Sequence, residues 1–201
     1  MKSIYAVRSL FIAVCAVILT GCAHRITLTG DTAALVASPQ STQSRIDKSV
    51  GLVIPDALRT KEFVTPGGGG DKVSYMPYRD LELPLYVGLG HAFSSVTKFD
   101  SVPDSATVQA KNLSCIVTPA ISTTSSSGSL VTWPPTDFSV TLACTITDPT
   151  GKLVATKEVT GNGHAEFSEF KRNFGLAAQR ATLDAVQKLQ AAMLESTELR
   201  H

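Results

Sequence analysis

The sequence contains four cysteines and four histidines, its main candidates for acylation, redox chemistry, metal binding or general base catalysis. Cys15 and Cys22 lie close together near the N-terminus, within and just after an apolar run. Cys115 and Cys144 lie far from them, in segments that alternate apolar and polar residues. The two pairs are therefore expected to have separate roles.

The N-terminal segment predicts a signal peptide. Lys2 and Arg8 make residues 1–8 positively charged, and Leu10–Leu19 is an unbroken apolar run. A membrane-spanning helix needs about 20 such residues, whereas the apolar region of a secretory signal peptide has roughly 7–15. The run is too short to span a bilayer and has the length typical of a signal peptide.

The end of this run, Leu19-Thr20-Gly21-Cys22, resembles the lipobox of bacterial lipoproteins. The resemblance covers only residues 1–22. It implies that the Cys22 thiol receives a diacylglycerol, that residues 1–21 are removed, and that the new amine is acylated. By the family's sorting rule, Ala23 rather than Asp after the cysteine implies delivery to the outer membrane of a bacterium with two membranes. The alternative is an ordinary secreted protein with a chance cysteine here.

Composition and charge exclude several classes of protein. The chain has 201 residues, with 18 basic and 17 acidic side chains and a formal net charge of +1. This balance offers no basic stripe for nucleic acid and no polyanionic tail. Loss of Lys2 and Arg8 with the leader leaves one more acidic than basic side chain, so the acyl chains alone are expected to hold the protein on the membrane.

The remaining cysteines predict a structural disulfide, as expected in an oxidising compartment. An antiparallel pairing that sets Cys115 opposite Cys144 also aligns the apolar faces of both segments, with Val117 opposite Leu142. A bridge closing about 30 residues would stabilise the fold by about 3.5 kcal/mol in the chain-entropy model. Two buried, reduced cysteines are the alternative, and no ligand spacing around either predicts a metal site.

The histidines offer weak catalytic candidates. His24 and His201 are expected to be solvated. His91 lies beside the apolar stripe of a predicted helix, and His164 follows a Gly-Asn-Gly turn predicted at 161–163, without a partner evident in the sequence. An exposed or half-buried histidine is the expected state of both.

No recognisable catalytic or cofactor motif accompanies these residues. The G-x-S-x-G and H-E-x-x-H patterns are absent. Gly67–Gly70 lacks the Lys-Ser/Thr and the following helix of a phosphate-binding loop, and therefore predicts a flexible loop between strands. Glu166 and Glu169 are expected in a solvated turn. We expect no enzymatic activity, no metal and no cofactor.

One aromatic residue is a candidate for an interface. Trp133 is the only tryptophan and lies in a long, mostly polar loop at 122–137. Tryptophan is enriched in the energetic centres of protein interfaces. The alternative is that Trp133 folds back onto the edge of the sheet.

The first half of the chain predicts a tether and then the start of a domain. Residues 23–48 are rich in Ser, Thr and Ala and predict a flexible tether with at most a short strand at 25–29. A buried strand at 50–54 begins the domain, followed by two strands around the glycine loop. Residues 81–96 have helical spacing, with Asp80 as the N-cap and Pro84 in the first turn.

The second half predicts three antiparallel strands and a helix. The strands are expected at 107–121, 137–147 and 152–160, and the last two meet at a type I turn, Asp148–Gly151, which sets Ile146 opposite Leu153. An amphipathic helix capped near Asn173 runs to about residue 196.

These elements predict an α+β fold, with a mostly antiparallel sheet of about five strands packed by two helices. The expected organisation is a leader at 1–21, a lipid anchor and tether at 22–48, and one periplasm-facing domain at 49–201. The order of elements resembles small envelope-accessory lipoproteins of Gram-negative bacteria, which accompany transport, peptidoglycan or outer-membrane assembly machines.

Three functional hypotheses remain from the sequence. The leading one is a non-enzymatic adaptor or accessory subunit, anchored in the outer membrane and bound to an envelope protein partner. The second is an envelope hydrolase or a carrier of a small lipid-like ligand, using His91 or His164. The third is a structural protein that self-assembles through its last helix.

Replacing the lipobox cysteine tests the anchor. Cys22→Ala removes the thiol that the acylation would use, so the protein should move from the membrane fraction to the soluble fraction on centrifugation of broken cells. If the variant still sediments with outer membranes, the lipid-anchor hypothesis is wrong.

Overall fold

The computed structural model describes residues 23–30, 32–36, 43–66, 72–128 and 134–201. In chain order its elements are β1 (His24–Arg25), α2 (Thr32–Val36), β2 (Ile46–Val53), α3 (Asp56–Arg59), β3 (Phe63–Val64), β4 (Val73–Tyr75), α4 (Pro77–Ala92), β5 (Phe93–Phe99), α5 (Ser105–Ala110), β6 (Leu113–Ser126), β7 (Asp137–Thr147), β8 (Leu153–His164), α6 (Phe167–Phe170) and α7 (Leu176–Leu194). No helix within these ranges is both long enough and apolar enough to cross a membrane.

The predicted α+β class is confirmed, but the sheet is mixed. The five-stranded sheet has the order β5-β2-β6-β7-β8, and a smaller sheet has the order β1-β4-β3. Strands β6, β7 and β8 form the predicted antiparallel meander, whereas β2 pairs parallel with both β5 and β6. Parallel neighbours need a crossover connection. Helix α4 provides it before β5, and α5, which the sequence analysis missed, lies in the connection from β5 to β6.

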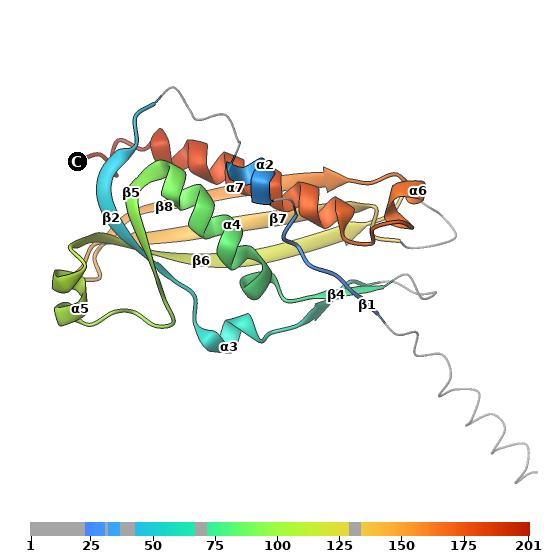
Figure 1. The fold of residues 1–201 in the computed structure, drawn as a ribbon, viewed down its shortest axis with the longest axis horizontal. Helices are drawn as coiled ribbons and strands as arrows, with labels where there is room; N and C mark the ends of the chain where they lie inside the picture. The colour runs from blue at the N-terminus through green and yellow to red at the C-terminus, as the bar shows by residue number, and fades with distance from the viewer. Residues whose placement is uncertain (1–22, 31, 37–42, 67–71, 129–133) are drawn as a thin grey trace, which may run out of the picture.

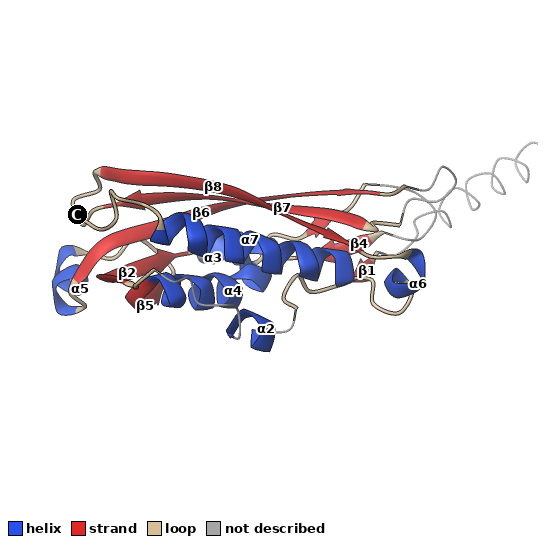
Figure 2. Ribbon diagram, turned by 90° about the horizontal axis from the view of Figure 1, so that it is seen from above, coloured by secondary structure: helices blue, strands red, loops and turns tan. Residues whose placement is uncertain are grey.

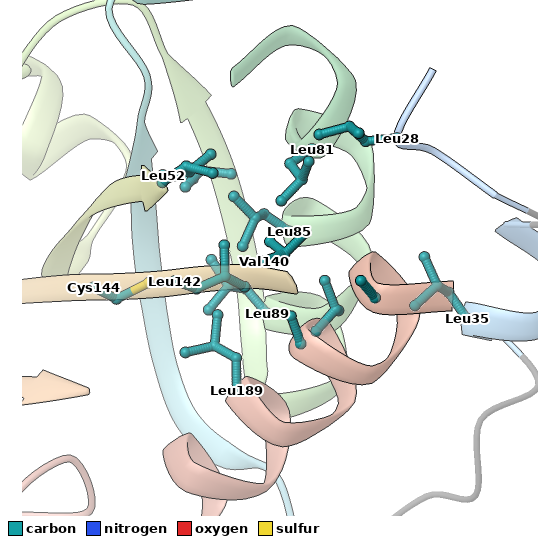
Figure 3. Close-up of a cluster of buried hydrophobic side chains, with 14 of the residues drawn as sticks. Leu28, Leu35, Leu52, Leu81, Leu85, Leu89, Val140, Leu142, Cys144 and Leu189 are labelled. Atoms are coloured by element: carbon teal, nitrogen blue, oxygen red, sulfur yellow. The ribbon is translucent and has the colours of Figure 1, made fainter. Parts of the chain in front are cut away.

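Helices cover one face of the large sheet. Figures 1 and 2 show α7 and α4 packed side by side along that face, with α2 outside them. In β7 every second residue is buried, which matches the predicted period of two for a sheet with one solvated face. Figure 3 shows leucines of α4, such as Leu85 and Leu89, meeting Val140 and Leu142 of β7 in the core.

The last helix lies unusually close to β8. A Cβ atom on Gly161 would lie 2.2 Å from the amide nitrogen of Ala185, and one on Gly163 would lie 2.0 Å from the carbonyl oxygen of Ala177. Only glycine on the strand allows this approach. The alanine-rich side of α7, a candidate surface for self-assembly, is thus covered by β8 of the same chain.

Side chains of α7 also satisfy backbone groups along β8. Asp184 accepts a hydrogen bond from the backbone N–H of Asn162 at 2.9 Å, and Lys188 donates to the carbonyl oxygen of Thr160 at 2.9 Å. Asp184 and Lys188 form the ion pair expected from their i,i+4 spacing, at 2.7 Å. At this end of the edge strand, side chains of α7 therefore already hydrogen-bond to outward-facing backbone groups of β8.

The predicted disulfide is wrong. Cys115 and Cys144 are both free and buried, and Cys144 lies opposite Pro119 instead. Four residues along a strand separate positions by about 13 Å, well beyond the Cα separation of about 4.4–6.8 Å in a disulfide. In the observed register Val117 faces Ile146. A shift of four residues keeps every side chain on its face, so alternation could not distinguish the two registers.

The predicted turn is confirmed, with a shifted register beside it. The N–H of Gly151 donates to the carbonyl oxygen of Asp148 at 3.0 Å, and Gly151 has a φ of 87°. An irregularity between Ile146 and Thr147 then sets Ile146 opposite Ala155 rather than Leu153.

Much of the expected tether belongs to the folded domain. Strand β1 pairs parallel with β4, and Ile26, Leu28 and Leu35 are buried in the core. Strand β2 begins at Ile46, earlier than expected. The sequence alone favours a tether here because the few large apolar residues of the segment are spread among Ser, Thr and Ala.

Helix α4 begins at Pro77, so Asp80 is not its N-cap and Pro84 lies inside the helix. Proline has no N–H, which leaves the carbonyl four residues earlier without its helical partner. That carbonyl belongs to Asp80, and it accepts a hydrogen bond from the hydroxyl of Thr29. The Asp80 carboxylate also accepts from the N–H of Leu28 at 3.3 Å. Pro84 thus creates a docking point for the N-terminal segment.

The close contact between strand and helix should be sensitive to a single methyl group. Gly163→Ala forces α7 away from β8 and should lower the free energy of unfolding by about 3 kcal/mol. Gly90→Ala is the matched control, because its Cβ meets nothing within 4 Å and a helix interior favours alanine by up to about 1 kcal/mol. Urea unfolding of both variants measures the difference. Equal stabilities would contradict the proposed close contact.

Candidate functional site

A cleft lies at the end of the meander where β6 and β8 finish and β7 begins. Its volume is about 450 Å³. Its lining is Ser127, Gly128, Pro134, Thr136, Asp137, His164, Ala165, Glu166 and Phe167. A second hollow of about 400 Å³ shares Asp137 and His164. These two residues therefore lie between the two concave surfaces.

The antiparallel register brings His164 and Asp137 together. His164 is the last residue of β8 and lies directly opposite Asp137, the first residue of β7. The imidazole Nδ1 lies 2.7 Å from the Asp137 carboxylate, and Nε2 lies 3.4 Å from that of Glu166. The Gly-Asn-Gly segment before His164 belongs to the strand, so the predicted turn is wrong. Extending the register predicted from the Asp148–Gly151 turn would set His164 opposite Pro135, because the irregularity between Ile146 and Thr147 shifts the pairing by two residues.

Glu166 and Glu169 organise the short helix beside the cleft, rather than a plain solvated turn. They form a reciprocal capping box at the start of α6, in which the N–H of Glu166 donates to the Glu169 carboxylate at 3.0 Å. Arg180 of α7 donates to Glu169 at 3.0 Å and to the carbonyl oxygen of His164 at 2.6 Å. The Arg180 guanidinium lowers the pKa of Glu169.

Two carboxylates favour the charged imidazole. Hydrogen bonds to Asp137 first, and to Glu166 second, raise the pKa of His164 above its ordinary value of 6.5. The side chain is exposed, so solvent screens the interaction. A raised folded-state pKa means that the pairing stabilises the fold fully below pH 6.5 and that this contribution is lost as the pH rises through the folded-state pKa.

The contacts of the imidazole determine what His164 can do in the cleft. Both ring nitrogens of His164 are directed at carboxylates, so neither is directed at a hydroxyl or thiol that it could activate. Among the apolar residues that line the cleft, Phe167 is 51% exposed, whereas Pro134 and Ala165 are buried. No group of three or more His, Cys, Asp or Glu side chains in the described ranges could hold a metal ion.

The structure does not bring the other predicted site residues together with His164. His91 lies on α4, where its Nδ1 is buried and has no hydrogen-bond partner among the described residues. His24 is not simply solvated, because its ring stacks on that of Phe174 at 4.2 Å. Burial raises the pKa of Cys144 to about 12 and also raises that of Cys115. Cys22, Trp133 and residues 67–71 lie outside the described residues.

No family model and no curated protein matches the chain. Its fold does have similar solved structures. A Xanthomonas campestris protein of the family DUF330 is 9% identical, with 85% of this chain and 89% of that chain covered and a TM-score of 0.47. A minor lipoprotein of Acinetobacter baumannii is 12% identical, with 73% and 92% covered and a TM-score of 0.45. At these values the likeness concerns the general arrangement of the chain and does not assign a function.

Titration of the cleft histidine tests this geometry. The imidazole proton resonances of His164 should titrate above pH 6.5 in NMR spectra, because Asp137 and Glu166 stabilise its charged form. Asp137→Asn removes the nearer charge and should move the midpoint down toward 6.5. A midpoint that does not change in this variant would contradict the pairing.

Proposed function

We propose that this chain is an outer-membrane lipoprotein, acylated at Cys22, whose periplasm-facing domain serves as a non-enzymatic accessory subunit for envelope assembly or transport. The lipobox and Ala23 support the anchor and its membrane. The cleft around His164 supports a binding role. We propose that the partner, an envelope protein, docks at this cleft.

The observation that carries the binding role is the state of His164. An imidazole that serves as a general base needs a nitrogen directed at the proton it removes. Here both nitrogens contact carboxylates, and the charged side chains of His164, Asp137 and Glu166 are exposed at the cleft, where polar groups of a partner can pair with them. This arrangement supports docking more than it supports the hydrolase alternative.

The size of the cleft favours one second candidate, a carrier of a small lipid-like ligand. Small-molecule sites typically occupy about 300–1,000 Å³ and are mostly apolar with a few polar groups. The cleft, at about 450 Å³ with His164, Asp137 and Glu166 on its rim, lies within that range. The carrier function differs from the adaptor function in what should co-purify with the protein.

Filling the cleft distinguishes these functions. The lipidated protein is isolated from gently solubilised envelopes, and its companions are identified by mass spectrometry. Gly128 lines the cleft and a Cβ atom there meets nothing within 4 Å, so Gly128→Leu adds a bulky side chain at the cleft without a backbone clash. Gly90→Leu is the matched control, at a glycine of α4 that is equally open and outside the cleft lining.

We expect a stoichiometric protein partner with the wild type and Gly90→Leu, and at least a tenfold loss with Gly128→Leu, about 1.4 kcal/mol of binding free energy. Recovery of only a small apolar molecule, lost in Gly128→Leu, would replace the adaptor with the carrier. A partner that remains bound to Gly128→Leu would show that docking occurs elsewhere.

A further inference from the structure

The proposed lipid anchor is joined to the folded domain without a spacer. Ala23 follows Cys22 directly, and His24 is already in β1, where its N–H donates to the carbonyl oxygen of Lys72 at 2.8 Å. The N–H of Ile26 donates to the carbonyl oxygen of Ser74 at 2.9 Å. In the sequence, a single residue, Ala23, therefore separates the proposed acylation site from the first hydrogen-bonded residue of β1.

A series of aromatic contacts connects this point to α6. The His24 ring stacks on Phe174 at 4.2 Å, Phe174 meets Phe170 edge-to-face at 5.0 Å, and Phe170 stacks with Phe167 at 6.5 Å. Phe170 is buried, whereas Phe167 is 51% exposed. Figures 1 and 2 show β1 and α6 at the same end of the molecule, opposite α5. An exposed phenylalanine thus lies at the end from which the anchor leaves.

The surroundings of Phe167 suit the boundary between lipid and water. The Lys171 ammonium lies 5.7 Å from the centre of the Phe167 ring, and Arg172 follows it in sequence. Phenylalanine favours the acyl boundary, while a lysine stem can follow apolar surface and keep its charge at the phosphate level. Arg25, in β1, lies 3.9 Å from the Glu62 carboxylate and keeps a side chain that is 61% exposed.

We propose that the end of the domain formed by β1 and α6 rests on the lipid surface that holds the anchor, with Phe167 at the depth of the headgroups and Lys171 directed at phosphate. This inference depends on the proposed acylation of Cys22. Because no spacer separates the acyl chains from β1, the anchor keeps this end at the bilayer. The cleft, whose wall includes Phe167, consequently opens beside the membrane.

Spin labels at two exposed positions test the contact. The full lipidated protein is reconstituted into vesicles of phosphatidylethanolamine and phosphatidylglycerol, with a nitroxide attached at Phe167→Cys or at Val102→Cys. Val102 is the matched control, since it is apolar, 69% exposed and located just before α5 at the opposite end. Cys115 and Cys144 are buried and should not react with the label.

The measurement compares collisions of each label with oxygen, which concentrates in lipid, and with a water-soluble nickel chelate. The same labels in Cys22→Ala protein made without residues 1–21, and so without Cys15 and the apolar leader, give the aqueous reference. We expect the oxygen-to-nickel ratio at position 167 to be several-fold above its reference, and the ratio at 102 to equal its reference.

Two results would overturn the proposal: one contradicts only the membrane contact, and the other also contradicts the proposed anchor. An aqueous ratio at 167 on protein that floats with the vesicles and carries acyl groups on Cys22 overturns the membrane contact and leaves the proposed function intact. Absence of acyl groups on Cys22, shown by mass spectrometry of the same sample, overturns both.

Discussion

A missing hydrogen bond in α4 governs how the N-terminal segment joins the domain. Pro84 cannot donate to the carbonyl of Asp80, and the Thr29 hydroxyl donates to it instead. The buried Asp80 carboxylate accepts from the backbone of Leu28, whose side chain is fully buried. A residue that usually disrupts a helix thus provides the site where the preceding chain is held. The short strand β1 comes just before this contact and is held by its own parallel pairing with β4.

The proposed roles of the molecule follow from that placement. If the segment after Cys22 were a free tether, the domain could turn toward any partner in the periplasm. Because the segment is folded, the proposed acylation site is joined directly to the domain that carries the cleft around His164. The proposed docking site should therefore lie at a fixed distance from the membrane. This favours a partner that is itself embedded in or attached to the same bilayer.

Local sequence patterns predicted where strands and turns lie better than they predicted which residues pair across strands. Alternation located β7 at its observed bounds, and the Asp148–Gly151 turn was recognised because its residues favour that geometry. Alternation cannot fix a register that slips by an even number of residues, so the pairing of Cys115 with Cys144 was wrong. The role of Pro84 was missed because it depends on Thr29, far away in sequence. His164 was a candidate, but its pairing with Asp137 required the register of β7 and β8.

The hydrogen bonds from side chains of α7 to the backbone of β8 affect how anchored copies of such a protein could associate. An acylated protein is confined to two dimensions, where copies meet at high local density and in a common orientation. An edge strand with open N–H and carbonyl groups would invite neighbouring copies to add strand to strand. Asp184 and Lys188 occupy such groups at Asn162 and Thr160, within one chain. If the chain is anchored as we propose, copies crowded in the plane of the bilayer would meet an edge strand whose outward backbone groups are already hydrogen-bonded along this part of the sheet.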